Sequence, residues 1–121
     1  WVMIRPWDET LLGLIGFDNI TRTSEAKWNL GYWVRSSEQR HGFAKKSINA
    51  TLGWLGAVEE VIVELKVDPM NLAGVNTVSQ TVSNWNGERN ISGDSAVTVA
   101  GVRTLHHCHL VVTNPKSTEI M

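Results

Sequence analysis

The chain has 121 residues, of which 42% are hydrophobic and 19% charged, with a formal net charge of -1. This length suits one compact domain over residues 1–121, and the composition argues against disorder. The near-neutral charge provides no broad basic field, which argues against an extended nucleic-acid surface.

Cys108 is the single cysteine of the sequence. An internal disulfide is therefore excluded, and a reducing compartment, the cytoplasm, is expected. No apolar run approaches the ~20 residues that cross a bilayer, and no basic-then-apolar leader is seen ahead of the predicted fold, so we expect no membrane partner.

The N-terminal part is predicted to form strands. Apolar runs at 1–5 and 11–20 flank a polar turn, which is typical of an antiparallel hairpin. A third strand is predicted over Trp28–Val34, where Gly31 is expected to mark a bulge or a close backbone approach.

A helix, a strand and a weaker helix should follow. Apolar residues recur at helical spacing from Ala44 to Leu55, although Gly53 and Gly56 are expected to weaken the end of this helix. Residues 61–68 alternate as a strand does, and valines after Asn71 indicate a second helix. The remaining segments are predicted as a loop over 84–94, a hairpin of 96–99 with 104–113, and a tail over 114–121.

The most informative segment, Gln39–Ala44, lies between the third strand and the first helix. A helix N-terminus leaves backbone N–H groups without intrahelical partners and adds the positive end of a dipole, and a small residue such as Gly42 lets an anion approach. This segment therefore predicts a pyrophosphate-binding turn and a nucleotide-like ligand. The alternative is an ordinary helix start.

Four short motifs in this order resemble the GNAT family of acetyl-CoA-dependent N-acetyltransferases, and within it the Rim-type branch, which acetylates protein N-termini. They are Leu14–Gly16, Leu30–Val34, Gln39–Ala44 and Val67–Asn71. The resemblance covers roughly residues 11–82. It implies an α+β fold whose mixed, mostly antiparallel sheet has splayed central strands flanked by helices, in a chain that lacks the family's N-terminal strand and helix pair.

The resemblance also implies the chemistry, in which an amine acceptor attacks the thioester of acetyl-CoA directly. Backbone N–H groups near Val34 and Arg35 would bind the oxyanion and pantetheine, and Asn71 would meet the cofactor or the acceptor. The expected cofactor-binding residues are Val34, Arg35, Gln39, Arg40, His41, Gly42, Phe43, Ala44, Lys45 and Asn71.

The sequence departs from the family at two chemical positions. Asn29 stands where relatives often have a glutamate base, and Gly74 stands where a serine hydroxyl protonates the leaving thiolate in some relatives. The remaining candidates for catalysis are Tyr32, as a proton donor, Glu64, which could orient an amine, and Asn71.

Each of these candidates has a structural alternative. Tyr32 suits strand packing, Glu64 suits a solvated strand face, and Lys45 suits a solvated helix start rather than a phosphate contact. The histidines beside Cys108 suggest a metal, but strand alternation places two of the four residues on each face, so no metal is expected. One of these histidines near the cleft could instead act as a base.

The sequence thus predicts an acetyl-CoA-dependent transferase that acts on a protein N-terminus or on a small amine. The alternative is a CoA-binding or dimerising module with little or no catalysis. A homodimer is expected in either case, because a partner could cover the tryptophan-rich first strands.

Overall fold

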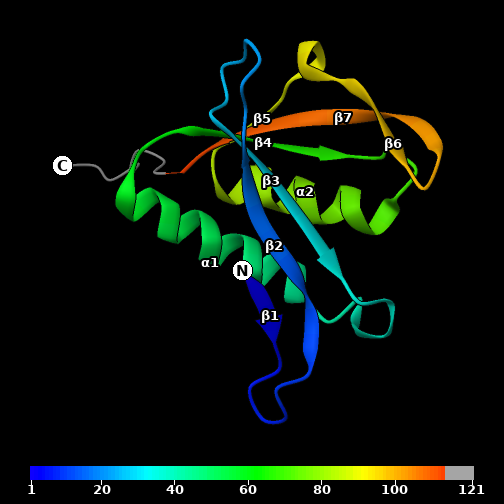
Figure 1. The fold of residues 1–121 in the computed structure, drawn as a ribbon. Coiled ribbons are helices and arrows are strands. Elements are labelled where there is room, and N and C mark those ends of the chain that lie inside the picture. Colours follow the sequence, from blue (N-terminus) through cyan, green and yellow to red (C-terminus); the bar gives the residue numbers. More distant parts are fainter. Residues whose placement is uncertain (114–121) are drawn as a thin grey trace.

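A computed structural model describes residues 1–113 of the chain. Along these residues run two α-helices and seven strands (Figure 1). The helices are α1 (Phe43–Val58) and α2 (Leu72–Asn84), and short 3₁₀ turns cover Ser36–Glu38 and Ile91–Gly93. The strands are β1 (Val2–Ile4), β2 (Leu11–Asn19), β3 (Trp28–Val34), β4 (Ile62–Val67), β5 (Glu88–Arg89), β6 (Ser95–Val99) and β7 (Val102–Val112).

The strands form one mixed sheet in the order β1-β2-β3-β4-β7-β5, with β6 paired to β7. Every pair within this order is antiparallel except β3 with β4, which is parallel. This confirms the predicted α+β fold and both predicted hairpins. The predicted loop over 84–94 also contains the short strand β5, and the predicted tail at 114–121 lies outside the described residues.

The sheet splits between its central strands. In the described part of the chain, β3 pairs with β4 only at Trp28 with Val63 and at Asn29 with Glu64. Beyond these residues β3 stays with β2 and β4 stays with β7, and Figure 1 shows the two strands running apart. The predicted splay is therefore present, and it opens towards Val34.

Both helices pack on one face of this sheet, because each carries an apolar stripe. Ile48, Leu52 and Leu55 of α1 and Val78 of α2 are buried against core residues of β2, β3 and β4. The helix α1 continues through Gly53 and Gly56, since this packing outweighs the unfavourable helix propensity of glycine.

A close backbone approach occurs at Gly13, not at Gly31 as predicted. A Cβ atom added to Gly13 would lie 2.0 Å from the carbonyl oxygen of Trp33, whereas one added to Gly31 would meet nothing within 4 Å. The register shift in these strands falls between Met3 and Ile4. The alternation of the sequence alone does not reveal how closely two strands approach.

The C-terminal strands are joined by a charged cluster around Asp94. Arg89 donates to both carboxylate oxygens of Asp94, at 2.6 and 2.7 Å, and the Cys108 N–H donates to one of them at 2.8 Å. The Arg89 guanidinium holds the pKa of the Asp94 carboxyl well below its usual range.

Asp94 should therefore make the stability of the fold sensitive to acid. A carboxyl whose pKa is lower in the folded state stabilises the fold above its unfolded pKa, near 4, and this contribution is lost as the pH falls below that value. We expect the melting temperature of Asp94→Asn to fall less than that of the wild type between pH 5 and pH 2. Parallel melting curves check this, and equal falls would contradict it.

Candidate functional site

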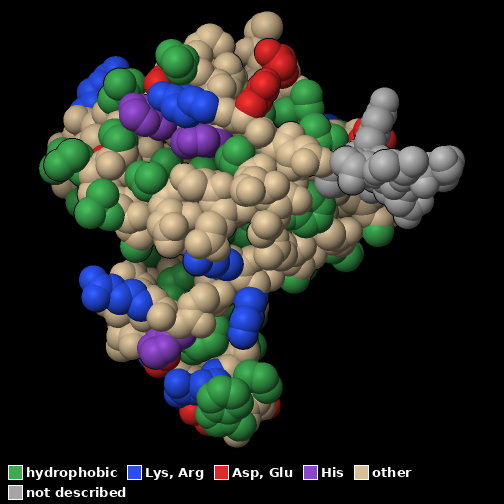
Figure 2. All heavy atoms as spheres, turned by 180° about the vertical axis from the view of Figure 1, so that it is seen from behind, with side chains coloured by type: hydrophobic (Ala, Val, Ile, Leu, Met, Phe, Trp, Pro, Cys, Tyr) green, Lys and Arg blue, Asp and Glu red, His purple; other side chains and the backbone are tan. Residues whose placement is uncertain are grey.

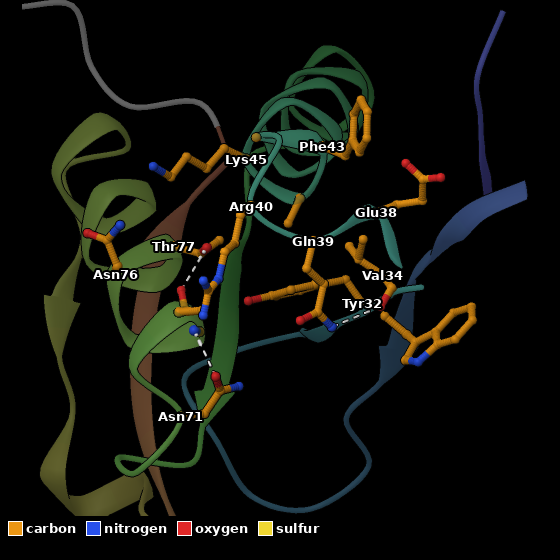
Figure 3. Close-up of a pocket in the computed structure, with 15 residues that line it drawn as sticks. Tyr32, Val34, Glu38, Gln39, Arg40, Phe43, Lys45, Asn71, Asn76 and Thr77 are labelled. Atoms are coloured by element: carbon orange, nitrogen blue, oxygen red, sulfur yellow. Dashed lines mark hydrogen bonds between the residues drawn. The ribbon is translucent and has the colours of Figure 1, made fainter. Parts of the chain in front are cut away.

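A cleft of about 480 Å³ opens where β3 and β4 separate. Its walls are the end of β3, the turn that leads into α1, the first turn of α1 and the first half of α2. Figure 2 shows the molecule hollowed on this side, with Lys and Arg side chains around the notch, and Figure 3 shows the lining residues. Of the expected cofactor-binding residues, the lining includes Val34, Gln39, Arg40, Gly42, Phe43, Ala44, Lys45 and Asn71.

The turn into α1 presents backbone N–H groups to this cleft. Gly42 is the N-cap residue with φ of 77°, in the left-handed region that favours glycine, and no side chain caps this helix end within the described residues. Its first intrahelical bond runs from the Lys46 N–H to the Gly42 carbonyl at 3.1 Å. The N–H groups of Phe43, Ala44 and Lys45 precede that bond and thus have no intrahelical acceptor.

Positive charge reinforces this helix end. The first turn of α1 contains no acidic residue, and both Arg40 and Lys45 line the cleft. In Figure 3 the Arg40 side chain extends across the middle of the cleft towards α2. Arg40 itself has φ of 70°, an unusual backbone conformation for a side-chain-bearing residue, which aims it inward. The arrangement suits a ligand with negatively charged groups.

The end of β3 offers a further backbone donor. The Arg35 N–H donates to the Leu12 carbonyl of β2 at 2.7 Å, so this group is engaged and Arg35 does not line the cleft. Hydrogen bonding alternates along an antiparallel strand, so the N–H and carbonyl of the preceding residue, Val34, point away from β2. Gln39 Nε2 donates to that carbonyl at 3.1 Å, which leaves the Val34 N–H facing the split.

Tyr32 crosses the cleft from β3 to α2. Its side chain is half-buried, and in Figure 3 it points from the strand into the cleft. Burial raises the pKa of Tyr32, and the nearby Thr77 hydroxyl partly opposes this effect. Thr77 in turn donates to the Ala73 carbonyl at 3.0 Å. The phenol therefore remains protonated at neutral pH.

Asn71 and Gly74 together shape the start of α2. Asn71 is the N-cap residue, and its side-chain oxygen accepts a hydrogen bond from the Gly74 N–H at 3.1 Å. A Cβ atom at Gly74 would lie 2.6 Å from Asn71 Nδ2 and 2.9 Å from Val67 Cγ2. A serine therefore does not fit at position 74 without a shift of the Asn71 or Val67 side chain.

Glu64 lies outside this cleft. Val63 faces the helices, so its neighbour Glu64 lies on the opposite face of the sheet. The expectation of a solvated position was wrong, because Glu64 is only 2% exposed. It pairs with Arg22 at 2.5 Å and lies 3.8 Å from both Lys66 Nζ and Cys108 Sγ. Burial, followed by the nearby Glu64 charge, raises the pKa of Cys108 to about 11.

The histidines take no part in the cleft. His41 is exposed and packs against Phe43, with ring centroids 5.7 Å apart. His106, His107 and His109 of β7 do not line the cleft either. Among residues 1–113, no group of three or more metal-ligating side chains is assembled.

Sequence reasoning missed Thr77 and Arg22. Thr77 lies one helical turn after Ala73, so the helical period starting at Asn71 could have placed it at the cleft. No local signal indicates Arg22, because its contact with Glu64 joins residues 42 positions apart.

No protein-family model and no curated protein matches the sequence. The fold of the chain does resemble those of several solved structures. A ribosomal-protein-S5-alanine acetyltransferase from Vibrio fischeri aligns with a TM-score of 0.74, 16% identity and 93% of this chain. An acetyltransferase (GNAT family) from Bacillus anthracis aligns with a TM-score of 0.66, 14% identity and 93% of this chain. The chain has the GNAT fold.

Mycobacterium smegmatis RimJ, solved in complex with CoA-disulfide, also has this GNAT fold, with a TM-score of 0.63, 18% identity and 87% of this chain covered. The chain spans 60%, 64% and 49% of the Vibrio, Bacillus and Mycobacterium structures, respectively. At these identities the likeness defines the GNAT fold alone. In the described residues neither helix has the length and apolar composition needed to cross a membrane.

Proposed function

We propose that this chain binds acetyl-CoA and transfers its acetyl group to a primary amine. The observation that carries the proposal is the continuity of the cleft, which joins the uncapped N-terminus of α1 to the split between β3 and β4. One end suits a pyrophosphate and the other suits an extended thioester arm. The likeness in fold to acetyltransferases, one of them solved with a CoA derivative, supports the same assignment.

The residues of the cleft divide into three roles under this proposal. The N–H groups of Phe43, Ala44 and Lys45, with Arg40, hold the pyrophosphate. The Val34 N–H donates to the oxyanion that develops on the thioester carbonyl as the amine attacks. The Tyr32 hydroxyl gives its proton to the departing thiolate, and the attacking amine loses one proton to solvent, from which the phenolate regains its own.

The acceptor enters from the opposite face of the sheet. Asn29 and Glu64 are paired across β3 and β4 at the closed end of the split, on the face away from the helices. An amine on that face reaches the thioester through the opening between the strands, which begins beyond Asn29 and lies towards Val34. A protein N-terminus and a small amine both satisfy this requirement.

A single titration series tests the proposal. Saturable binding of acetyl-CoA, followed by release of free CoA thiol in the presence of a panel of peptide and small amines, is the expected result. The absence of acetyl-CoA binding by a folded sample would overturn it.

A second candidate is a CoA-binding module with little or no catalysis. It is favoured by the Arg22 contact, which occupies the Glu64 carboxylate, and by Asn29, whose side-chain amide cannot act as a base. Acetyl-CoA binding without thiol release across the panel would select this candidate.

A homodimer is also proposed, because apolar side chains lie exposed on the first strands. Val2 and Leu14 pair across β1 and β2, Leu14 pairs with Trp33 of β3, and all three are about half exposed. Such a row on an edge strand and its neighbours suits a second copy. Sedimentation should show a dimer that Trp33→Glu disrupts; a wild-type monomer at high concentration would contradict this.

A further inference from the structure

A second, smaller pocket of about 270 Å³ lies on the face of the sheet opposite the helices. It occupies the closed end of the split, where Asn29 of β3 is paired with Glu64 of β4. Its polar lining is completed by Asp18 and Asn19 at the end of β2 and by Thr21 and Arg22 in the following connection. Two carboxylates and one guanidinium thus share a small space.

The two members of the Arg22–Glu64 pair differ in how firmly they are held. The Glu64 side chain is 3% exposed and belongs to a central strand, which fixes its carboxylate. The Arg22 side chain is 49% exposed and belongs to the irregular connection between β2 and β3. If the pair opens, Arg22 can move into solvent at little cost, while Glu64 stays in place.

Glu64 nevertheless needs a cation beside it. A buried carboxylate without a partner is strongly unfavourable. Lys66 Nζ lies 3.8 Å away and donates to Ser95 Oγ at 2.7 Å, and the Cys108 thiol lies 3.8 Å from the other oxygen. Neither replaces the direct contact that Arg22 makes. The position of the Arg22 guanidinium is therefore a cation site that an arriving ammonium group could occupy.

We propose that Arg22 occupies the site of a cationic acceptor, and that a primary ammonium group binds Glu64 by displacing it. This inference rests on the proposed function for its catalytic meaning. The ammonium group would gain Glu64, with Asp18 and the side-chain oxygen of Asn29 as further acceptors in the same pocket. Arg22 lowers the affinity for every amine and so selects acceptors that carry enough positive charge to compete.

The test measures binding of 1,4-diaminobutane to the full chain by NMR titration of backbone amides. If the ion pair is closed for roughly nine tenths of the time, Arg22→Ala should bind the diamine roughly tenfold more tightly than the wild type. Lys27→Ala is the matched control, because Lys27 belongs to the same connection but pairs with Glu59 instead. This control should bind as the wild type does, and the largest shifts should fall around Asn29 and Glu64.

A double variant locates the effect. Arg22→Ala with Glu64→Gln should lose the gained affinity, because the carboxylate is gone. Equal affinity in the wild type and Arg22→Ala, or a gain that persists in the double variant, would overturn the inference. If Arg22→Ala does not fold, Arg22→Gln removes the charge but keeps a hydrogen-bonding group. Acetyl-CoA binding, measured on the same samples, separates failure of this inference from failure of the proposed function.

Discussion

Gly42→Val should abolish acetyl-CoA binding. The φ of 77° at Gly42 is strained for a β-branched residue. Valine therefore either changes the conformation of the turn or destabilises the fold by about 1–3 kcal/mol. A Cβ atom at this position meets nothing within 4 Å, so the added methyl groups occupy the space that an anion would need. We expect a loss of at least about 100-fold in affinity by calorimetry, equal to ~2.7 kcal/mol.

Gly53→Ala is the matched control for this prediction. Gly53 lies within the same helix, and a Cβ atom there also meets nothing within 4 Å. Alanine should raise the free energy of unfolding by roughly 0.5–1 kcal/mol and leave acetyl-CoA affinity unchanged. Unchanged affinity in Gly42→Val would show that the turn does not hold the cofactor.

Tyr32→Phe should lower kcat by roughly 10- to 100-fold while acetyl-CoA affinity stays within about twofold. General acid catalysis contributes typically 10²–10⁴-fold, and a thiolate, with a pKa near 8.5, needs less assistance than most leaving groups. Thr77 lines the same cleft as Tyr32, and we expect its hydroxyl to position the phenol, so Thr77→Val should give a smaller loss of kcat and Thr77→Ser should restore most of it.

The measurement is steady-state release of CoA thiol with a saturating amine. If Tyr32 only packs in the strand, phenylalanine should serve equally well and kcat should not change. Equal values for the valine and serine variants of Thr77 would remove the positioning role, because only serine retains the hydroxyl.

The sequence predicts the order of elements well, because hydrophobic periodicity and the turn residues that end each element are local features. The helix from Gly42, the strand before Asp68 and the turn at Ala100 each follow from neighbouring residues, and the structure places them as expected. The pyrophosphate-binding role of the turn stays a prediction, but the free N–H groups that it requires are present.

The misjudged positions depend on partners that are distant in the sequence. The burial of Glu64 follows from β7 on one side and from Arg22 on the other, and neither contact is visible in the alternation of residues 61–68. The Arg35 N–H is engaged because Leu12 lies across the hairpin. Long-range register decides both, and a single sequence does not specify it.

The sheet separates two pockets, one on each of its faces, and the split between β3 and β4 lies between them. Tyr32 on β3 belongs to the helix-side cleft, while Asn29 on the same strand belongs to the pocket on the other side. A change of acceptor could therefore evolve through the β2–β3 connection without altering the anion-binding turn. An inhibitor that joins a cofactor analogue to an amine would have to pass through the opening between β3 and β4. The shortest linker that still allows both parts to bind would measure the distance between the two pockets across the sheet.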